Sequence, residues 1–323
     1  MVTRRAALAA GLLALARPAL AAWPERPVRL VVPFAAGGNL DTLMRLTAPL
    51  ISQRLGQPIV VENRVGAGGN IGAEAVARSA PDGYTMLVGS NGPITSNPIL
   101  MARMPYDAAK DFAPVGLAFR TPNVLVVGSK VPVNTLAEFI AYAKARPGQL
   151  ACASAGTGTT NHLNIELLNA ATGMGLTHIP YRSSGNATPD LISGTLASAM
   201  DQITTALPMH RAGQLKIIGL GLPQRIPALP DVQSFAEAGV EGGGLVAFVA
   251  VFAPSGTPAG VISRMREALA GALADAALRE RVEGLGNLVA TPEQTTPEGL
   301  AAILRQETAL SRRAAELAGL QPQ

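Results

Sequence analysis

A short apolar run that stops at a pair of glycines constrains the fold of this chain most. The β-branched residues of Val28–Val32 predict a strand, and Gly37 and Gly38 precede a helical pattern that starts at Leu40. Such a turn leaves the first N–H groups of the helix without intrahelical acceptors, at the positive end of the helix dipole. The sequence therefore predicts an α/β fold with an anion-binding site at this helix start.

Strands and helices alternate along most of the chain. Apolar residues from Leu40 to Leu55 fall on one helix face, where Gly56 is placed to cap the helix and Pro49 is expected to kink or shorten it. Further strands are predicted at Pro58–Val61, Tyr84–Val88, Val124–Val127, Leu150–Ala153, His178–Tyr181, Ala197–Asp201, Leu215–Leu220 and Phe248–Phe252. Helices are predicted at Asn70–Ser79, Leu136–Ala145 and Thr160–Ala171, and two terminal helices follow, the first from Val261. The first βαβαβ segment implies parallel strands.

The length of the chain indicates two domains. About 300 residues exceed what one hydrophobic core usually holds. Short connections near residues 122 and 245 suit a chain that crosses twice between two units. We expect one lobe from residues 22–122 together with 246–323, and a second lobe from residues 123–245.

The first 21 residues have the pattern of a secretion signal. Basic residues Arg4 and Arg5 precede the apolar run Ala6–Ala16, and Ala19-Leu20-Ala21 offers the small residues that a signal peptidase needs. The run is too short for a spanning helix. We expect cleavage after Ala21 and a periplasmic protein. Two alternatives stay open: export by the twin-arginine route, and a cytosolic amphipathic helix.

Composition argues against several classes of protein. Removal of Arg4, Arg5 and Arg17 with the signal takes the formal charge from +4 to +1, which gives no ground for nucleic-acid binding. Cys152 is the only cysteine, so no internal disulfide forms. The segment 66–72 has Ile71 at the third glycine position of a dinucleotide fingerprint, and the chain contains no Gly-Lys pair. We expect no cofactor and no metal site.

A serine hydrolase is the competing class. Residues 152–156 resemble a nucleophile elbow around Ser154, but Cys152 replaces its first glycine. His162 follows eight residues later at a helix start and is badly placed to act as a base, and His178 and His210 offer no obvious pairing. We therefore expect a protein that is not an enzyme.

A second loop rich in glycine and hydroxyl groups leads into a helix at residues 154–163. It offers Ser154, Gly156, Thr157, Gly158 and Thr159, and its alternative interpretation is an ordinary helix cap from Thr159 or Thr160. Together with Gly37 and Gly38, this loop suggests two helix starts, one from each lobe, that close on one small carboxylate. Neutral donors would then bind the anion without a buried lysine.

The order of several motifs resembles one family, the extracytoplasmic solute receptors of tripartite tricarboxylate transporters, also called Bug or TctC-type proteins. The similarity covers residues 23–319. Its densest parts are Trp23–Pro27 with Val31–Phe34, Val61–Arg64 with Gly66–Gly69, Pro81–Thr85, Tyr106-Asp107, Asp111–Val115, Ser154–Leu163, Pro180-Tyr181 and Ala253–Pro258. Ala35-Ala36, Arg182, Ser183-Ser184 and Phe248 depart from the usual family pattern.

The resemblance implies a type II periplasmic-binding-protein fold, in which two α/β lobes close around a ligand. It also implies a small carboxylate ligand and transient contact with membrane transporter subunits, or with a sensor kinase instead of a transporter. We expect a monomer. The ligand loops of the family correspond here to further site residues: Phe34, Asp41, Asn91, His162, Tyr181, Ser184 and Asp201. Asp201 has two interpretations, a solvated acid at a strand end or a charge that selects among ligands.

Overall fold

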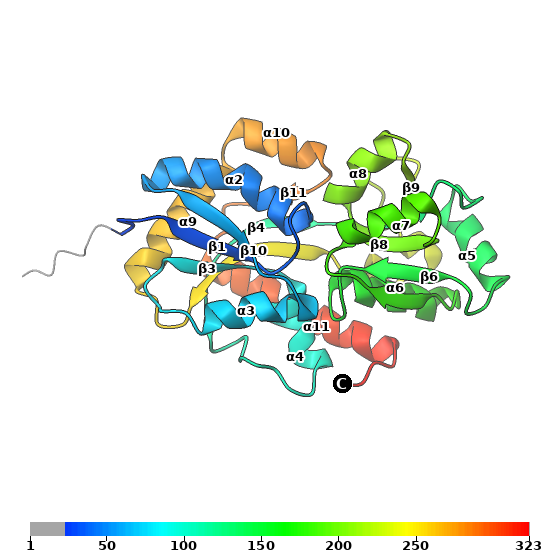
Figure 1. Ribbon diagram of the computed structural model, residues 1–323, viewed down its shortest axis with the longest axis horizontal. Helices are drawn as coiled ribbons and strands as arrows, with labels where there is room; N and C mark the ends of the chain where they lie inside the picture. The colour runs from blue at the N-terminus through cyan, green and yellow to red at the C-terminus, as the bar shows by residue number, and fades with distance from the viewer. Residues whose placement is uncertain (1–22, 323) are drawn as a thin grey trace, which may run out of the picture.

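The structure, a computed structural model, describes residues 23–322 apart from the side chain of Ser184. The predicted secretion signal, residues 1–21, lies outside the described residues. Figure 1 shows two α/β lobes side by side, each built on its own sheet, which agrees with the fold class expected from the sequence.

The strands are β1 (Val28–Val32), β2 (Ile59–Asn63), β3 (Thr85–Gly89), β4 (Phe112–Thr121), β5 (Asn123–Gly128), β6 (Ala151–Ser154), β7 (Thr177–Pro180), β8 (Ser198–Gln202), β9 (Leu215–Gly221), β10 (Ala247–Pro254) and β11 (Leu288–Val289). The α-helices are α2 (Asn39–Leu55), α3 (Asn70–Ala77), α4 (Asn97–Leu100), α5 (Leu136–Lys144), α6 (Thr160–Thr172), α7 (Thr188–Ser193), α8 (Ile203–Arg211), α9 (Ala259–Leu273), α10 (Ala276–Gly284) and α11 (Pro297–Leu317). Short helical turns are η1 (Ala67–Gly69), η2 (Gly92–Ser96), η3 (Ser184–Ala187), η4 (Ala236–Ala238) and η5 (Glu241–Gly243).

The first lobe is built on a sheet with the strand order β11-β4-β10-β3-β1-β2. Strand β1 lies parallel to both β2 and β3, as the βαβαβ pattern predicts. Strand β10 lies antiparallel between β3 and β4. This arrangement brings the C-terminal end of β1, and the loop that leads to α2, to the edge of the lobe that faces its neighbour.

The second lobe is built on a sheet with the strand order β7-β6-β8-β5-β9. Alternate side chains of β5 enter two different hydrophobic clusters: Leu125 and Val127 pack on one face of the sheet, and Val124 and Val126 on the other. Because successive side chains of a strand point to opposite faces, helices can cover both sides of this sheet. The two lobes connect through Pro122, between β4 and β5, and through the longer segment between β9 and β10.

The last helix, α11, belongs to both lobes. Leu300 and Ile303 near its start pack in the core of the first lobe, whereas Ala314 and Ala315 near its end join a cluster of the second lobe. Figure 1 shows this helix passing above α4 and ending beneath α6. The C-terminal tail is thereby brought to the boundary between the lobes.

Several local predictions prove wrong. Of the two effects expected of Pro49, a kink or a shorter helix, the shortening does not occur. Helix α2 continues to Leu55, because its buried face, which includes Leu43 and Ile51, anchors it in the core. Three helices, not two, follow β10: Asp275 accepts a hydrogen bond from the N–H of Leu278 at 2.9 Å and so begins α10 close behind α9.

Strand β4 is not predicted, because Pro114 and Gly116 interrupt its apolar pattern. The pairing of β4 with β10 shifts register in that region: Val251 of β10 pairs with Gly116, but the next residue, Phe252, pairs with Pro114. Such an irregularity accommodates the proline, which has no N–H to give to the ladder.

Candidate functional site

A small buried cavity lies between the starts of α2 and α6, one helix from each lobe. Its volume is about 30 Å³. It is lined by Phe34, Gly38, Asn39, Leu40, Ser90, Asn91, Gly92, Ala155, Thr159, Thr160, Asn161, Ser183, Gln202 and Ala247. None of these lining residues is charged. We call this space the inner cavity; it offers amides, hydroxyls and backbone groups.

Both helix starts present backbone donors there. Helix α2 begins after Gly38, which has extended backbone and no side chain with which to cap the helix. Helix α6 begins after Thr159, whose hydroxyl accepts a hydrogen bond from the N–H of His162 at 3.4 Å. The cap interpretation of Thr159 is therefore correct, but one side chain satisfies only one of the N–H groups that lack an intrahelical acceptor. Two positive helix ends converge on one uncharged space.

Asn39 carries an unsatisfied polar atom in this wall. Its Oδ1 accepts hydrogen bonds from the hydroxyl of Thr204 at 2.5 Å and from that of Thr121 at 3.3 Å. Its Nδ2 is buried and has no hydrogen-bond partner among the described residues. An unpaired buried donor costs about 1–3 kcal/mol, so an acceptor bound in the inner cavity would relieve that cost.

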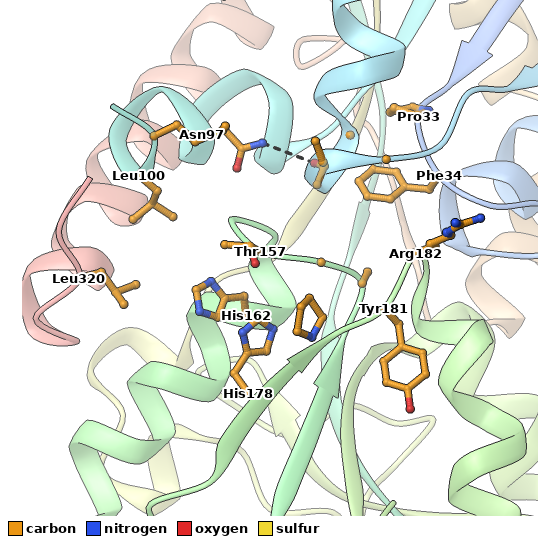
Figure 2. Close-up of a pocket in the computed structure, with 18 of the residues that line it drawn as sticks. Pro33, Phe34, Asn97, Leu100, Thr157, His162, His178, Tyr181, Arg182 and Leu320 are labelled. Atoms are coloured by element: carbon orange, nitrogen blue, oxygen red, sulfur yellow. Dashed lines mark hydrogen bonds between the residues drawn. The ribbon is translucent and has the colours of Figure 1, made fainter. Parts of the chain in front are cut away.

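A larger cavity adjoins the inner one and shares Phe34 and Ala155 with it. This outer cavity has a volume of about 510 Å³. Figure 2 shows its walls, which come from both lobes and from the C-terminal tail. It is lined by Pro33, Phe34, Gly66, Ala67, Gly68, Gly69, Asn97, Leu100, Met101, Ala155, Gly156, Thr157, His162, His178, Pro180, Tyr181, Arg182, Leu320 and Gln321.

The two histidines of the outer cavity form a stacked pair. The ring centroids of His162 and His178 lie 4.1 Å apart. Burial lowers the pKa of His162 to about 4. Burial, together with the neighbouring His162, lowers the pKa of His178 to about 3. Both rings are therefore neutral near pH 7, and the N–H of Gly158 donates to Nδ1 of His162 at 3.3 Å.

Ser154 has a histidine partner, so the expectation that His178 offers no pairing is wrong. The Oγ of Ser154 lies 2.6 Å from Nε2 of His178. Strand register explains the contact: His178 is paired with Cys152 across β6 and β7, and Ser154 is the next residue on the same face. The hydroxyl is fully buried, however, and also accepts the N–H of Gly156 at 3.0 Å. The side chain of Ser154 lines neither cavity, and its hydrogen bond with Gly156 holds the glycine-rich loop that follows β6.

The predicted site residues fall into three groups. Phe34, Gly38, Asn91 and Thr159 line the inner cavity, and Phe34, Gly156, Thr157, His162 and Tyr181 line the outer one. Gly37, Asp41, Ser154, Gly158 and Asp201 are not in the lining of either cavity. The side chain of Ser184 lies outside the described residues. In Figure 2 the hydroxyl of Tyr181 points away from the cavity, where it donates to Asp190 at 2.6 Å.

The two aspartates among the predicted site residues, Asp41 and Asp201, accept hydrogen bonds from nearby groups. Asp41 accepts three hydrogen bonds of 2.9 Å, from the N–H of Gly37, from Arg45 and from Asn63. Burial raises its pKa, but these partners outweigh burial and hold the pKa below its usual value. Asp201 accepts from the hydroxyl of Thr205 at 2.7 Å, at the start of α8. Both carboxylates are therefore bound within the protein.

Six further polar side chains line the inner cavity although none is among the predicted site residues: Asn39, Ser90, Thr160, Asn161, Ser183 and Gln202. A usable signal exists for three of them. Asn39, Thr160 and Asn161 are the first polar residues after the two glycine-rich loops, where a helix start places side chains beside its free N–H groups. The other three come from separate strand ends that only the fold brings together.

No group of three or more His, Cys, Asp or Glu side chains within residues 23–322 could hold a metal ion. Over the same range, the helices are too short or too polar for any of them to cross a membrane.

Two α/β lobes with a small polar cavity between them define a two-lobed periplasmic binding protein. Solved structures of similar proteins have the same fold. The periplasmic binding protein BugD is 34% identical, covers 93% of this chain and 100% of its own, and has a TM-score of 0.89. An R. palustris protein solved with adipate is also 34% identical, with the same coverages and a TM-score of 0.88. MatC from Rhodopseudomonas palustris, solved with bound malate, is 36% identical over 90% of this chain and 99% of its own, with a TM-score of 0.86.

The family itself is identified by its sequence model. The tripartite tricarboxylate transporter family receptor, TctC, matches residues 43–309. The chain therefore belongs to this family of solute receptors, as the order of its motifs indicates.

Proposed function

We propose that this chain captures a small organic carboxylate outside the cytoplasm and delivers it to the membrane subunits of a tripartite transporter. Membership of the receptor family supports this role, and two of the similar proteins were solved with carboxylates, adipate and malate. In this proposal residues 1–21 are a cleaved secretion signal, the mature protein is a periplasmic monomer, and contact with the transporter is transient.

The inner cavity is the observation that carries the proposal. One water needs about 10–15 Å³ of such space, so about 30 Å³ holds two oxygen atoms side by side. That is the size of one carboxylate group. Neutral donors at two helix starts, with the unpaired Nδ2 of Asn39 beside them, suit an anion that carries a single charge there.

Opening and closing of the two lobes would admit the ligand. We propose that residues 22–122 with 246–323 form one lobe and residues 123–245 the other, with the end of α11 reaching across to pack on the second lobe. Sheet membership supports these limits, since β4 ends at Thr121, β5 begins at Asn123 and β10 begins at Ala247. Binding without chemistry is part of the proposal, and the complete burial of Ser154 supports it.

The test introduces a charge into the inner cavity. Asn39→Asp keeps the size of the side chain and an acceptor for Thr204, but it sets a carboxylate beside the bound one. Two like charges about 4 Å apart repel by about 4 kcal/mol at an effective dielectric constant near 20. After a thermal-shift screen has found the tightest carboxylate, calorimetry should show at least about a hundredfold weaker binding by this variant.

Asn287→Asp is the matched control. Asn287 is also buried, and its Oδ1 lies within hydrogen-bond distance of the same two hydroxyl oxygens, 2.7 Å from that of Thr121 and 2.8 Å from that of Thr204. It lines neither cavity. This variant should carry a similar stability cost but lose less than about tenfold in affinity. Equal losses in both variants, or a screen in which no carboxylate raises the melting temperature, would contradict the proposal.

A further inference from the structure

The outer cavity differs from the inner one in the character of its walls. The side chains of Phe34, Leu100, Met101 and Leu320 give it a largely apolar surface, to which Pro33 and Pro180 add. A volume of about 510 Å³ lies within the usual range for a small-molecule site. Because the two cavities share Phe34 and Ala155, a ligand whose carboxylate enters the inner cavity would extend its body along this apolar surface.

Little in the outer cavity could neutralise a second carboxylate. Among the described lining residues, Arg182 is the only one that bears a permanent charge, and it is exposed. In Figure 2 its guanidinium lies on the far side of Phe34 from Leu100 and Leu320. His162 and His178 are neutral near pH 7, as described above. At the apolar end, beside Leu100, Met101 and Leu320, a second carboxylate would lose its hydration without gaining a charged partner.

The far wall is fixed in place by the end of α11. Gly319 has a positive φ of 64°, and the N–H of Leu320 donates to the carbonyl of Ala315 at 2.9 Å while the N–H of Gly319 donates to Glu316 at 3.1 Å. This pair of hydrogen bonds is a Schellman motif, which ends the helix and turns the next residue back against it. Leu320 thereby packs on the apolar cluster of the second lobe and faces the cavity.

We infer that the ligand of this chain is a monocarboxylate with an uncharged, mainly apolar body, and that Leu320 together with Leu100 and Met101 selects for that body. The inference rests on the proposed function and names the substrate class of the same site. It separates this chain from a receptor for short polyacids, since the inner cavity has room for one carboxylate and the outer cavity favours a hydrocarbon.

Hexanoate and adipate form the sharpest pair of probes. They have the same six carbons, and adipate differs by a second carboxylate in place of the terminal methyl group. Calorimetry at pH 7 should show that the wild-type protein binds hexanoate at least about tenfold more tightly than adipate. Adipate binding as tight as hexanoate, or tighter, would overturn the inference and leave the proposed function standing. Failure of both acids, and of every other carboxylate, would overturn the two together.

Leu320→Arg tests the wall itself. A guanidinium at this position could pair with the distal carboxylate of adipate, so the affinity ratio of adipate to hexanoate should rise at least about tenfold. Leu317→Arg is the control, since Leu317 is 43% exposed on the same helix and does not line the cavity. It adds the same charge and should leave the ratio unchanged. An equal response of the two variants would show that Leu320 does not contact the ligand.

The exposed Arg182 provides the last check. If wild-type protein prefers adipate and Arg182→Gln removes that preference, Arg182 binds a second carboxylate and the inference is wrong. If Arg182→Gln leaves the preference for hexanoate intact, Arg182 does not pair with a carboxylate of the ligand, as the inference requires. The comparison of hexanoate with adipate uses wild-type protein alone, so its result does not depend on whether any variant folds.

Discussion

At the scale of single residues, the absence of a side chain matters where the lobes approach each other. Gly158, in the second lobe, has a φ of 79°, and a Cβ there would overlap Oδ1 of Asn97 in α4 of the first lobe. A Cβ at Gly68 of the first lobe would likewise overlap the carbonyl of Thr157. Glycine is needed at these two positions because backbone and side chain of the opposite lobe fill the space a methyl group would take.

Gly158→Ala should therefore weaken ligand binding more than it weakens the fold. The positive φ costs about 1–2 kcal/mol in any state of the protein, whereas the overlap with Asn97 arises only when the lobes are together. We expect a loss of at least about tenfold in carboxylate affinity, measured by calorimetry. Gly148→Ala is the control, because Gly148 has a φ of 69° with no atom within 4 Å of an added Cβ. Gly148→Ala should lower the melting temperature as much as Gly158→Ala does, but it should leave the carboxylate affinity unchanged. If both variants lose the same affinity, Gly158 has a purely structural role.

At the scale of elements, the contact between α6 and β7 makes the second lobe sensitive to acid. His162 and His178 are buried and neutral in the fold, and their pKa values of about 4 and about 3 lie below the ordinary 6.5. Protonation therefore favours the unfolded chain. The stabilising contribution is present above pH 6.5 and is lost progressively as the pH falls from 6.5 through the folded pKa values. Glu166, whose Oε1 lies 3.8 Å from Nε2 of His162, is the acidic group that faces this pair.

The corresponding measurement is denaturant unfolding at pH 7 and pH 5. For His162 alone, the difference between the pKa values of the two states predicts a loss of about 2 kcal/mol between these pH values; His178 acts in the same direction. The double variant His162→Gln/His178→Gln should have a smaller drop in unfolding free energy. An unchanged drop in the double variant would place the acid-sensitive groups elsewhere.

The elements also show what the sequence can predict. Strands β1 to β3 and the cap at Gly56 follow from local patterns, and Gly56 has the expected left-handed conformation. Strand β4 does not follow from a local pattern, because its pairing with β10 depends on residues more than a hundred positions away. The two helix starts of the inner cavity are visible in the glycine-rich loops. The apolar wall of the outer cavity is not visible there, since Leu100 and Leu320 come to line one cavity only after α11 has crossed between the lobes.

At the scale of the whole molecule, two helix starts from separate lobes form one site with an uncharged lining, and this is the central claim. A crystal structure of the protein with hexanoate tests it most directly. We expect the carboxylate in the inner cavity, within hydrogen-bond distance of Nδ2 of Asn39 and of the first N–H groups of α2 and α6, with the hydrocarbon directed toward Leu320. A carboxylate bound instead to Arg182, or at the separate groove beside Arg45 and Arg281, with the two helix starts left without ligand contact, would contradict the account.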